Sequence, residues 1–405
     1  MPAISNKGRQ MPESPIRKLV PYAEAAKKRG VNVFHLNIGQ PDIKSPQKAL
    51  DAIRNIDLEV VEYSLSGGVT SYREKLAKYY QNIGLEISAD NVMITTGGSE
   101  ALLFGFMSCL DPGDEVIVTE PFYANYNGFA TAAGVKVVPI VSRIDSGFAL
   151  PDLSKIEDQI NDRTKAILVC NPGNPTGYLY TDQEIQKIAE FAINYDLFVF
   201  ADEVYREFCY DGREHKSIMS VKGLEEHAIM IDSVSKRYSM CGARIGSVVT
   251  KNQTVMDTMM KFAQARLSPP TFGQIAGEAA LDTGQEYFDE VTEEYTHRRN
   301  LMVNALNEIP GVMCPMPMGA FYCVAALPIE DAEDFCRWML ESFEHEGSTV
   351  MLAPANGFYS KPDLGKNQVR LAYVLNVEDL KKSLICLSLG LEAYKEQLTL
   401  KAETV

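Results

Sequence analysis

The sequence has few of the features that mark metal, secreted or membrane proteins. Its 8 cysteines include no C-x-x-C pair, and none of its 5 histidines stands at metal-ligand spacing. We therefore expect no metal site, and reduced thiols in a reducing compartment. No apolar run reaches the ~18 residues of a membrane-spanning helix, and the N-terminus lacks the apolar core of a signal peptide. These absences predict a cytoplasmic protein.

Positive charge is also in short supply. The chain has 39 Lys and Arg against 54 Asp and Glu, which gives a net charge of -15. This balance argues against nucleic acid or an anionic membrane as the main partner. With 405 residues, 46% of them hydrophobic, the chain is long enough for two domains or one large one. No internal repeat, low-complexity tract or long flexible linker is visible.

The most informative stretch is Ile231–Gly246, which reads I-D-S-V-S-K-R-Y-S-M-C-G-A-R-I-G. Lys236 follows a short apolar strand, with the hydroxyls of Ser233 and Ser235 beside it and Arg244 between two glycines. Hydroxyls and an arginine fork bind phosphate, and a lysine amine attacks an aldehyde carbonyl. An aldehyde and a phosphate together describe pyridoxal 5'-phosphate. Taken alone, the stretch fits an ordinary surface lysine almost equally well.

Strand and helix patterns alternate from about residue 91 to residue 250. This alternation predicts a mostly parallel sheet with helices on both faces. Ligands of such sheets gather beyond the carboxyl ends of the strands. The polar, glycine and aromatic residues that stand out all follow predicted strand ends, whereas residues placed for structural reasons would also occur at the opposite ends. These residues are Gly98, Ser99, Tyr123, Asn174, Asp202, Ser233 and Lys236.

Individually, these residues are weak signals. Gly98 and Ser99 open a helix after a strand, which suits an anion, although many such turns carry glycine for packing alone. Tyr123 could cover a flat ring or simply pack in the core. Asp202 ends a strand, where a buried carboxylate needs a cation or a donor, or else caps a helix.

Several longer motifs together resemble a known family. They are S-V-S-K-R-Y-S-M-C-G-A-R-I-G, N-P-G-N-P-T-G, A-D-E-V-Y and V-R-L-A-Y, in that family's order and approximate spacing. The chain resembles fold-type I, class I/II pyridoxal-phosphate-dependent aminotransferases over nearly its whole length, and the prokaryotic aspartate aminotransferases among them. The resemblance implies a large domain with a mostly parallel sheet and a smaller α+β domain.

The resemblance also implies roles for individual residues. Lys236 would form the internal aldimine and move the proton, Asp202 would pair with the pyridine nitrogen, and Tyr205 would hydrogen-bond the ring oxygen. The substrate would contact Asn174 and the fork of Arg370, with Gly39 closing over it. The implied cofactor-binding residues are Gly98, Ser99, Glu100, Tyr123, Asn174, Asp202, Tyr205, Ser233, Ser235, Lys236, Arg244 and, from a second subunit of a homodimer, Tyr63.

The implied reaction is ping-pong transamination between an L-amino acid and a 2-oxo acid, with aspartate and 2-oxoglutarate as the best guess. An aromatic or alanine aminotransferase, or a pyridoxal-phosphate lyase on the same fold, stays open, while retention of the motif residues makes a noncatalytic binding module improbable. Some relatives have a lysine where this chain reads M-P-E-S, so another cation would have to bind a side-chain carboxylate. The candidates are Arg9, Arg17 and Arg266.

The domain plan follows from the same patterns. Residues 1–14 would form an N-terminal arm, residues 46–295 the large cofactor-binding domain, and residues 15–45 with 296–405 the small domain. Two helix starts carry capping-box signatures, Ser71 with Glu74 and Thr181 with Glu184.

Overall fold

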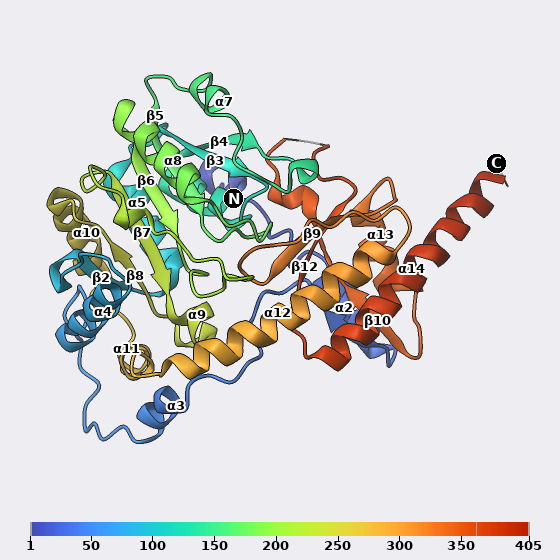
Figure 1. The fold of residues 1–405 in the computed structure, drawn as a ribbon, viewed down its shortest axis with the longest axis horizontal. Coiled ribbons are helices and arrows are strands. Elements are labelled where there is room, and N and C mark those ends of the chain that lie inside the picture. Colours follow the sequence, from blue (N-terminus) through green and yellow to red (C-terminus); the bar gives the residue numbers. More distant parts are fainter. Residues whose placement is uncertain (1, 362, 404–405) are drawn as a thin grey trace.

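A computed structural model describes residues 2–361 and 363–403. In this part of the chain, a seven-stranded sheet packs among helices, and two smaller sheets lie to one side of it (Figure 1). The strands are β1 Asn32–His35, β2 Val92–Thr95, β3 Glu115–Glu120, β4 Lys136–Val141, β5 Thr164–Cys170, β6 Phe198–Asp202, β7 Ala228–Ser233, β8 Gly246–Val249, β9 Tyr322–Ala326, β10 Ser348–Met351, β11 Ala353–Pro354 and β12 Gln368–Ala372.

The helices lie between and around these strands. No helix of residues 2–361 and 363–403 is long and apolar enough to cross a membrane. The α-helices are α1 Asn6–Gln10, α2 Val20–Lys28, α3 Gln47–Arg54, α4 Thr70–Asn82, α5 Gly97–Cys109, α6 Asn125–Ala133, α7 Leu153–Glu157, α8 Asp182–Asn194, α9 Val234–Arg237, α10 Gln253–Arg266, α11 Thr271–Ala280, α12 Gln285–Glu308, α13 Ala332–Ser342 and α14 Val377–Glu403.

The large sheet has the strand order β2-β8-β7-β6-β5-β3-β4. Every neighbouring pair is parallel except the two that involve β8, which runs antiparallel to both β2 and β7. The expected mostly parallel sheet is therefore confirmed. Because the parallel strands point the same way, the chain leaves β3, β5, β6 and β7 at one edge of the sheet.

Both faces of this sheet are buried under helices. Along β5, Ala166 and Leu168 pack in one apolar cluster with residues of α5, α6 and α10. The alternate residues Ile167 and Val169 pack in a second cluster with residues of α4, α8 and α11. Side chains of a strand alternate between its faces, and a strand covered on both sides is apolar throughout. This explains the unbroken A-I-L-V run.

The smaller sheets combine the two ends of the chain. Strand β1 pairs with β10, and β12 pairs with both β11 and β9. One apolar cluster joins residues from Leu19–Leu36 to residues after Val291. Helix α12 runs without a break from beside the large sheet to these smaller sheets (Figure 1). The domain border at residues 295 and 296 remains a prediction, and it falls within this helix.

One of the two predicted capping boxes is confirmed. The Thr181 side chain accepts from the backbone N–H of Glu184, and the Glu184 carboxylate accepts from the N–H of Thr181. The prediction for Ser71 was wrong, because the N-cap of α4 is Val69, two residues before Ser71, and it forms no side-chain cap. The hydroxyl of Ser71 instead donates to Glu278 on α11, so a tertiary contact replaces the local one.

Candidate active site

A cavity of about 520 Å³ opens at the carboxyl ends of the parallel strands. Asp202 ends β6, Ser233 ends β7, and Ser99 lies in the first turn of α5, so chain direction alone brings their side chains to one edge. Most residues predicted from the sequence line this cavity. They are Gly39, Gly98, Ser99, Tyr123, Asn174, Asp202, Tyr205, Ser233, Ser235, Lys236, Arg244 and Arg370.

Lys236 extends into the cavity from the short helix α9. Its Nζ atom donates a 2.9 Å hydrogen bond to the backbone carbonyl of Gly39 and lies 3.7 Å from the Sγ atom of Cys241. Gly39 follows β1 and lies 197 residues before Lys236 in the chain. The lysine amine thus lies where the N-terminal segment meets the large sheet, with no acidic side chain bonded to it among the described residues.

Asp202 is held by one oxygen only. The hydroxyl of Tyr126 donates a 2.7 Å hydrogen bond to Oδ2 of Asp202, whereas Oδ1 is buried without a partner in residues 2–361 and 363–403. Burial raises the pKa of Asp202 to about 6, and the hydrogen bonds from Tyr126 and the backbone N–H of Val204 oppose this rise. A buried carboxylate oxygen left open at a cavity wall suits a cationic donor of a ligand.

The start of α5 meets Arg244 closely. Gly97 has a φ of +76°, and a Cβ atom built there would lie 2.6 Å from Nη2 of Arg244. A side chain at this position would therefore displace the guanidinium. The hydroxyls of Ser233 and Ser235 lie 2.9 Å apart in the same cavity. A helix N-terminus, two hydroxyls and a guanidinium in one place form a set of anion donors.

Four residues singled out from the sequence lie elsewhere. Glu100 pairs with Arg266 through a 2.6 Å ion pair, so neither side chain lines the cavity of this chain. The expected roles of Glu100 in cofactor binding and of Arg266 as a side-chain receptor stay predictions, and neither side chain is among those that line the cavity. Arg9 lies on the exposed helix α1 and bonds Asn6. Tyr63, assigned to a second subunit, is 78% exposed.

Arg17 and several aromatic residues add to the cavity wall. Arg17 is the only one of the three candidate arginines that lines it. The sequence reasoning missed Tyr126, which lies three residues after Tyr123 in the first turn of α6. It also missed Tyr322, which starts β9 and also lines the cavity, and Cys241, whose place in the lysine motif was the available signal.

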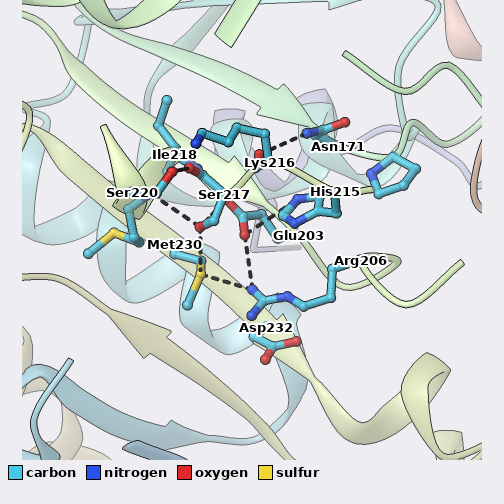
Figure 2. A network of polar contacts seen from close by, with 12 residues as sticks. Asn171, Glu203, Arg206, His215, Lys216, Ser217, Ile218, Ser220, Met230 and Asp232 are labelled. Carbon is cyan, nitrogen blue, oxygen red and sulfur yellow. Dashed lines mark hydrogen bonds and ion pairs between the residues drawn. The ribbon is translucent and has the colours of Figure 1, made fainter. Parts of the chain in front are cut away.

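A buried network of charged and polar side chains surrounds Glu203, the residue that follows Asp202 in the chain (Figure 2). The Glu203 carboxylate accepts from Arg206 at 3.0 Å, from the hydroxyl of Ser217 at 3.0 Å and from the backbone N–H of Ile218 at 2.9 Å. Burial raises the pKa of Glu203 to about 7, and burial lowers that of His215 to about 3. These bonds tie the segment after Asp202 to residues 217–218.

The network also reaches the end of β5. Figure 2 shows Asn171 beside Lys216, and the Nδ2 atom of Asn171 donates a 3.3 Å hydrogen bond to the Lys216 carbonyl. On the other side, the Asp232 carboxylate at the end of β7 pairs with Arg237. The positive charge of Arg206 is attracted to both Glu203 and Asp232, so buried electrostatic contacts link the segment that follows β6 to the end of β7.

Comparisons with known proteins agree with this geometry. The family described as "Aminotransferase class I and II" matches residues 31–382. An aspartate aminotransferase of Bacillus subtilis is 30% identical over 373 residues, covering 89% of this chain and 92% of its own. An aromatic-amino-acid aminotransferase of Thermococcus litoralis is 29% identical over 390 residues, covering 94% and 96%.

Solved structures show the same fold. The aspartate aminotransferase of Thermus thermophilus with maleate has a TM-score of 0.86 and 30% sequence identity, over 96% of this chain and 100% of that chain. The match covers the sheet, the cavity and the smaller sheets alike. Because the family match spans most of the chain, this protein belongs to the class I and II aminotransferases.

Proposed function

We propose that this chain binds pyridoxal 5'-phosphate and transfers the amino group of an L-amino acid, preferably aspartate, to 2-oxoglutarate. Arg17 carries the substrate part of the proposal, because it lies on the wall of the cavity that also contains Lys236 and Arg370. A dicarboxylic substrate needs two cations, one for each carboxylate. Arg370 is buried and would bind the α-carboxylate of the substrate inside the cavity. Arg17 is exposed and would bind the side-chain carboxylate nearer to solvent.

The residues present fit the cofactor. The unpartnered Oδ1 of Asp202 suits a protonated ring nitrogen, and the anion donors around Gly98, Ser99 and Arg244 suit a phosphate. The amine of Lys236 lies in the same cavity, within reach of a shared ligand. When bound, pyridoxal phosphate supplies an aldehyde and an electron-withdrawing ring that stabilises negative charge at the substrate Cα.

The chain's own residues would then perform the remaining steps. Lys236 would take the proton from the substrate Cα as a general base and then deliver it, as a general acid, to the aldehyde-derived carbon of the cofactor. Arg370 would orient the α-carboxylate, and Tyr123 would cover one face of the cofactor ring. The aromatic and aliphatic wall would exclude water from the reacting atoms.

A second substrate class has a specific observation in its favour. The cavity wall also includes Ile16, Ile38, Leu102 and Phe129, which would suit an apolar or aromatic side chain. The experiment that separates the two is a panel of amino donors with 2-oxoglutarate, following each 2-oxo acid product. Oxaloacetate from aspartate as the fastest product supports the proposal. Phenylpyruvate or pyruvate as the fastest product supports the other class, and ammonia release without an acceptor supports a lyase.

We also infer that the active form is a homodimer. The segment between α3 and α4 exposes five large apolar side chains, and it loops away from the large sheet (Figure 1). Exposed apolar surface of this kind favours a partner. Light scattering at working concentration measures the assembly, and a monomer with full activity would remove the role of Tyr63. The five side chains are Leu58, Val60, Val61, Tyr63 and Leu65.

A further inference from the structure

Tyr322 lies at the start of β9, between two parts of the cavity that no sequence motif connects. We propose that Tyr322 is a positioning residue that links Arg370, the expected receptor of the substrate carboxylate, to Tyr205, the expected partner of the cofactor ring oxygen. This inference rests on the proposed function. Tyr322 is 2% exposed and lines the cavity together with both of these residues.

The face of the Tyr322 ring supports the guanidinium of Arg370. The Cζ atom of Arg370 lies 4.7 Å from the centroid of the Tyr322 ring and 5.0 Å from that of Phe358. Arg370 is 1% exposed, its Nε atom has no hydrogen-bond partner, and it forms no ion pair within the described residues. Burial lowers its pKa. Arg370 also donates to the backbone carbonyl of Asn37 and to Asn174, and the two aromatic faces add to these contacts in stabilising a buried cation that has no counter-charge.

The hydroxyl of Tyr322 contacts Tyr205, the expected partner of the cofactor ring oxygen. Its oxygen lies 3.0 Å from the hydroxyl oxygen of Tyr205, and the two rings meet edge to face at 84°. Asn174 links Arg370 to Tyr205, because its Oδ1 accepts from Arg370 at 3.2 Å and its Nδ2 lies 3.5 Å from the Tyr205 hydroxyl. The contacts run from Arg370 through Asn174 and Tyr205 to Tyr322 and back to Arg370.

The direction of the tyrosine hydrogen bond follows from a count of donors. A tyrosine hydroxyl has a single O–H and can accept from other donors. If Tyr205 donates to a ligand in the cavity, its bond with Tyr322 requires Tyr322 to donate. The alternative acceptor for Tyr322, the carbonyl of Gly39, is 3.5 Å away and already accepts from Lys236 at 2.9 Å. Tyr322 therefore leaves the single O–H of Tyr205 free for the cavity.

Packing holds the Tyr322 ring in place. A Cβ atom on Gly39 would lie 1.7 Å from the Tyr322 oxygen and 2.3 Å from its Cζ atom, so the backbone of Gly39 lies directly against the ring. Strand β9 also pairs with β12, which carries Arg370. The ring thus cannot turn toward solvent while both neighbours stay in place, and its two contacts are maintained together.

Two substitutions separate the two contacts. Tyr322→Phe keeps the ring beneath Arg370 and removes the hydroxyl, whereas Tyr322→Leu removes both. Tyr373→Phe is the matched control, because Tyr373 is equally buried, its hydroxyl donates to the carbonyl of Ala320 at 3.2 Å, and it does not line the cavity. All variants are compared as the full-length protein, with and without pyridoxal phosphate.

Tyr322→Phe should raise the pH midpoint at which the visible absorption band of the bound cofactor changes, by about 0.5 to 1 unit. The reason is that a weakened O–H from Tyr205 stabilises the negative ring oxygen less. The KM for the 2-oxo acid should stay within about twofold. Tyr322→Leu should shift the band similarly and raise that KM about tenfold, because it also removes the aromatic face. Tyr373→Phe should change neither quantity.

A measurement without the cofactor makes the same distinction. Phenylglyoxal labelling of the cofactor-free protein, read by peptide mass spectrometry, should modify Arg370 faster in Tyr322→Leu and at the wild-type rate in Tyr322→Phe. An unchanged band midpoint in Tyr322→Phe, or the same shift in Tyr373→Phe, would overturn the inference. The absence of any cofactor band in the wild-type protein would instead overturn the proposed function. If Tyr322→Leu does not fold, Tyr322→Phe decides alone.

Discussion

The hydroxyl of Tyr126 donates to one oxygen of the Asp202 carboxylate at 2.7 Å, and the other oxygen has no partner in the described part of the chain. This arrangement orients the carboxylate and leaves one acceptor toward the cavity. It also has a cost, because a buried charge without a cation is unfavourable. The cofactor-free protein should therefore show the effect of this charge in its stability.

Asp202→Asn should stabilise the cofactor-free protein near neutral pH but not in acid. A carboxyl whose folded-state pKa is raised supports folding fully below its unfolded value and loses that contribution as pH rises through the folded value. For Asp202 the contribution is lost between pH 3.8, the usual pKa of the side chain, and about pH 6, its pKa in the folded protein. The full difference corresponds to roughly 3 kcal/mol.

Urea unfolding at pH 4 and pH 7.5 measures this difference. The gain of Asp202→Asn over wild type should appear at the higher pH alone. Asp158→Asn, which changes an exposed carboxylate, should alter stability by the same small amount at both pH values. A gain of equal size for Asp202→Asn at both pH values would show that its charge is not the cause.

Lys236→Ala should bind pyridoxal phosphate without a covalent link and lose at least about a thousandfold in turnover, because the proton at Cα then has no general base. Borohydride reduction followed by peptide mass spectrometry checks the link, and a coupled assay checks turnover. The exposed Lys155→Ala should retain both the adduct on Lys236 and full activity. Wild-type turnover in Lys236→Ala would refute the assignment.

Arg17→Met should raise the KM for aspartate and 2-oxoglutarate about fivefold, since an exposed ion pair contributes up to about 1 kcal/mol. The KM for alanine should not change, because alanine has no second carboxylate. Steady-state kinetics with both donors measures the split. Arg9→Met, outside the cavity, is the matched control. Equal effects on aspartate and alanine would remove Arg17 from substrate selection.

Glu203→Gln should lower the free energy of unfolding by roughly 2 kcal/mol, because glutamine keeps one of the two oxygens that accept from Arg206, Ser217 and the N–H of Ile218, and a buried donor then loses its acceptor. Denaturant unfolding of the cofactor-free protein measures the loss. Glu378→Gln is the control, since its ion pair with Lys382 is exposed and should contribute little. A loss no larger than that of the control would show that the charge of Asp232 is enough to stabilise the buried Arg206 in the absence of the Glu203 carboxylate.

Local pattern and chain direction were enough for much of the fold. The alternation of strands and helices predicted the parallel sheet, and the rule that ligands gather at carboxyl strand ends placed Asp202, Asn174 and Lys236 at one edge. Both inferences depend on residues close in sequence. The capping-box prediction at Ser71 used only neighbouring residues too, and it was wrong because the Ser71 hydroxyl donates to Glu278 on another helix.

Only the tertiary structure decided which long side chains reach the cavity. Glu100 and Arg266, 166 residues apart, neutralise each other outside it, and Arg17 lines it. Tyr322 joins the site because β9 pairs with the strand that carries Arg370. The sequence by itself determined the order of the strands along the chain and the chemistry at their ends. The partners of flexible side chains depend on distant packing, which no local pattern encodes.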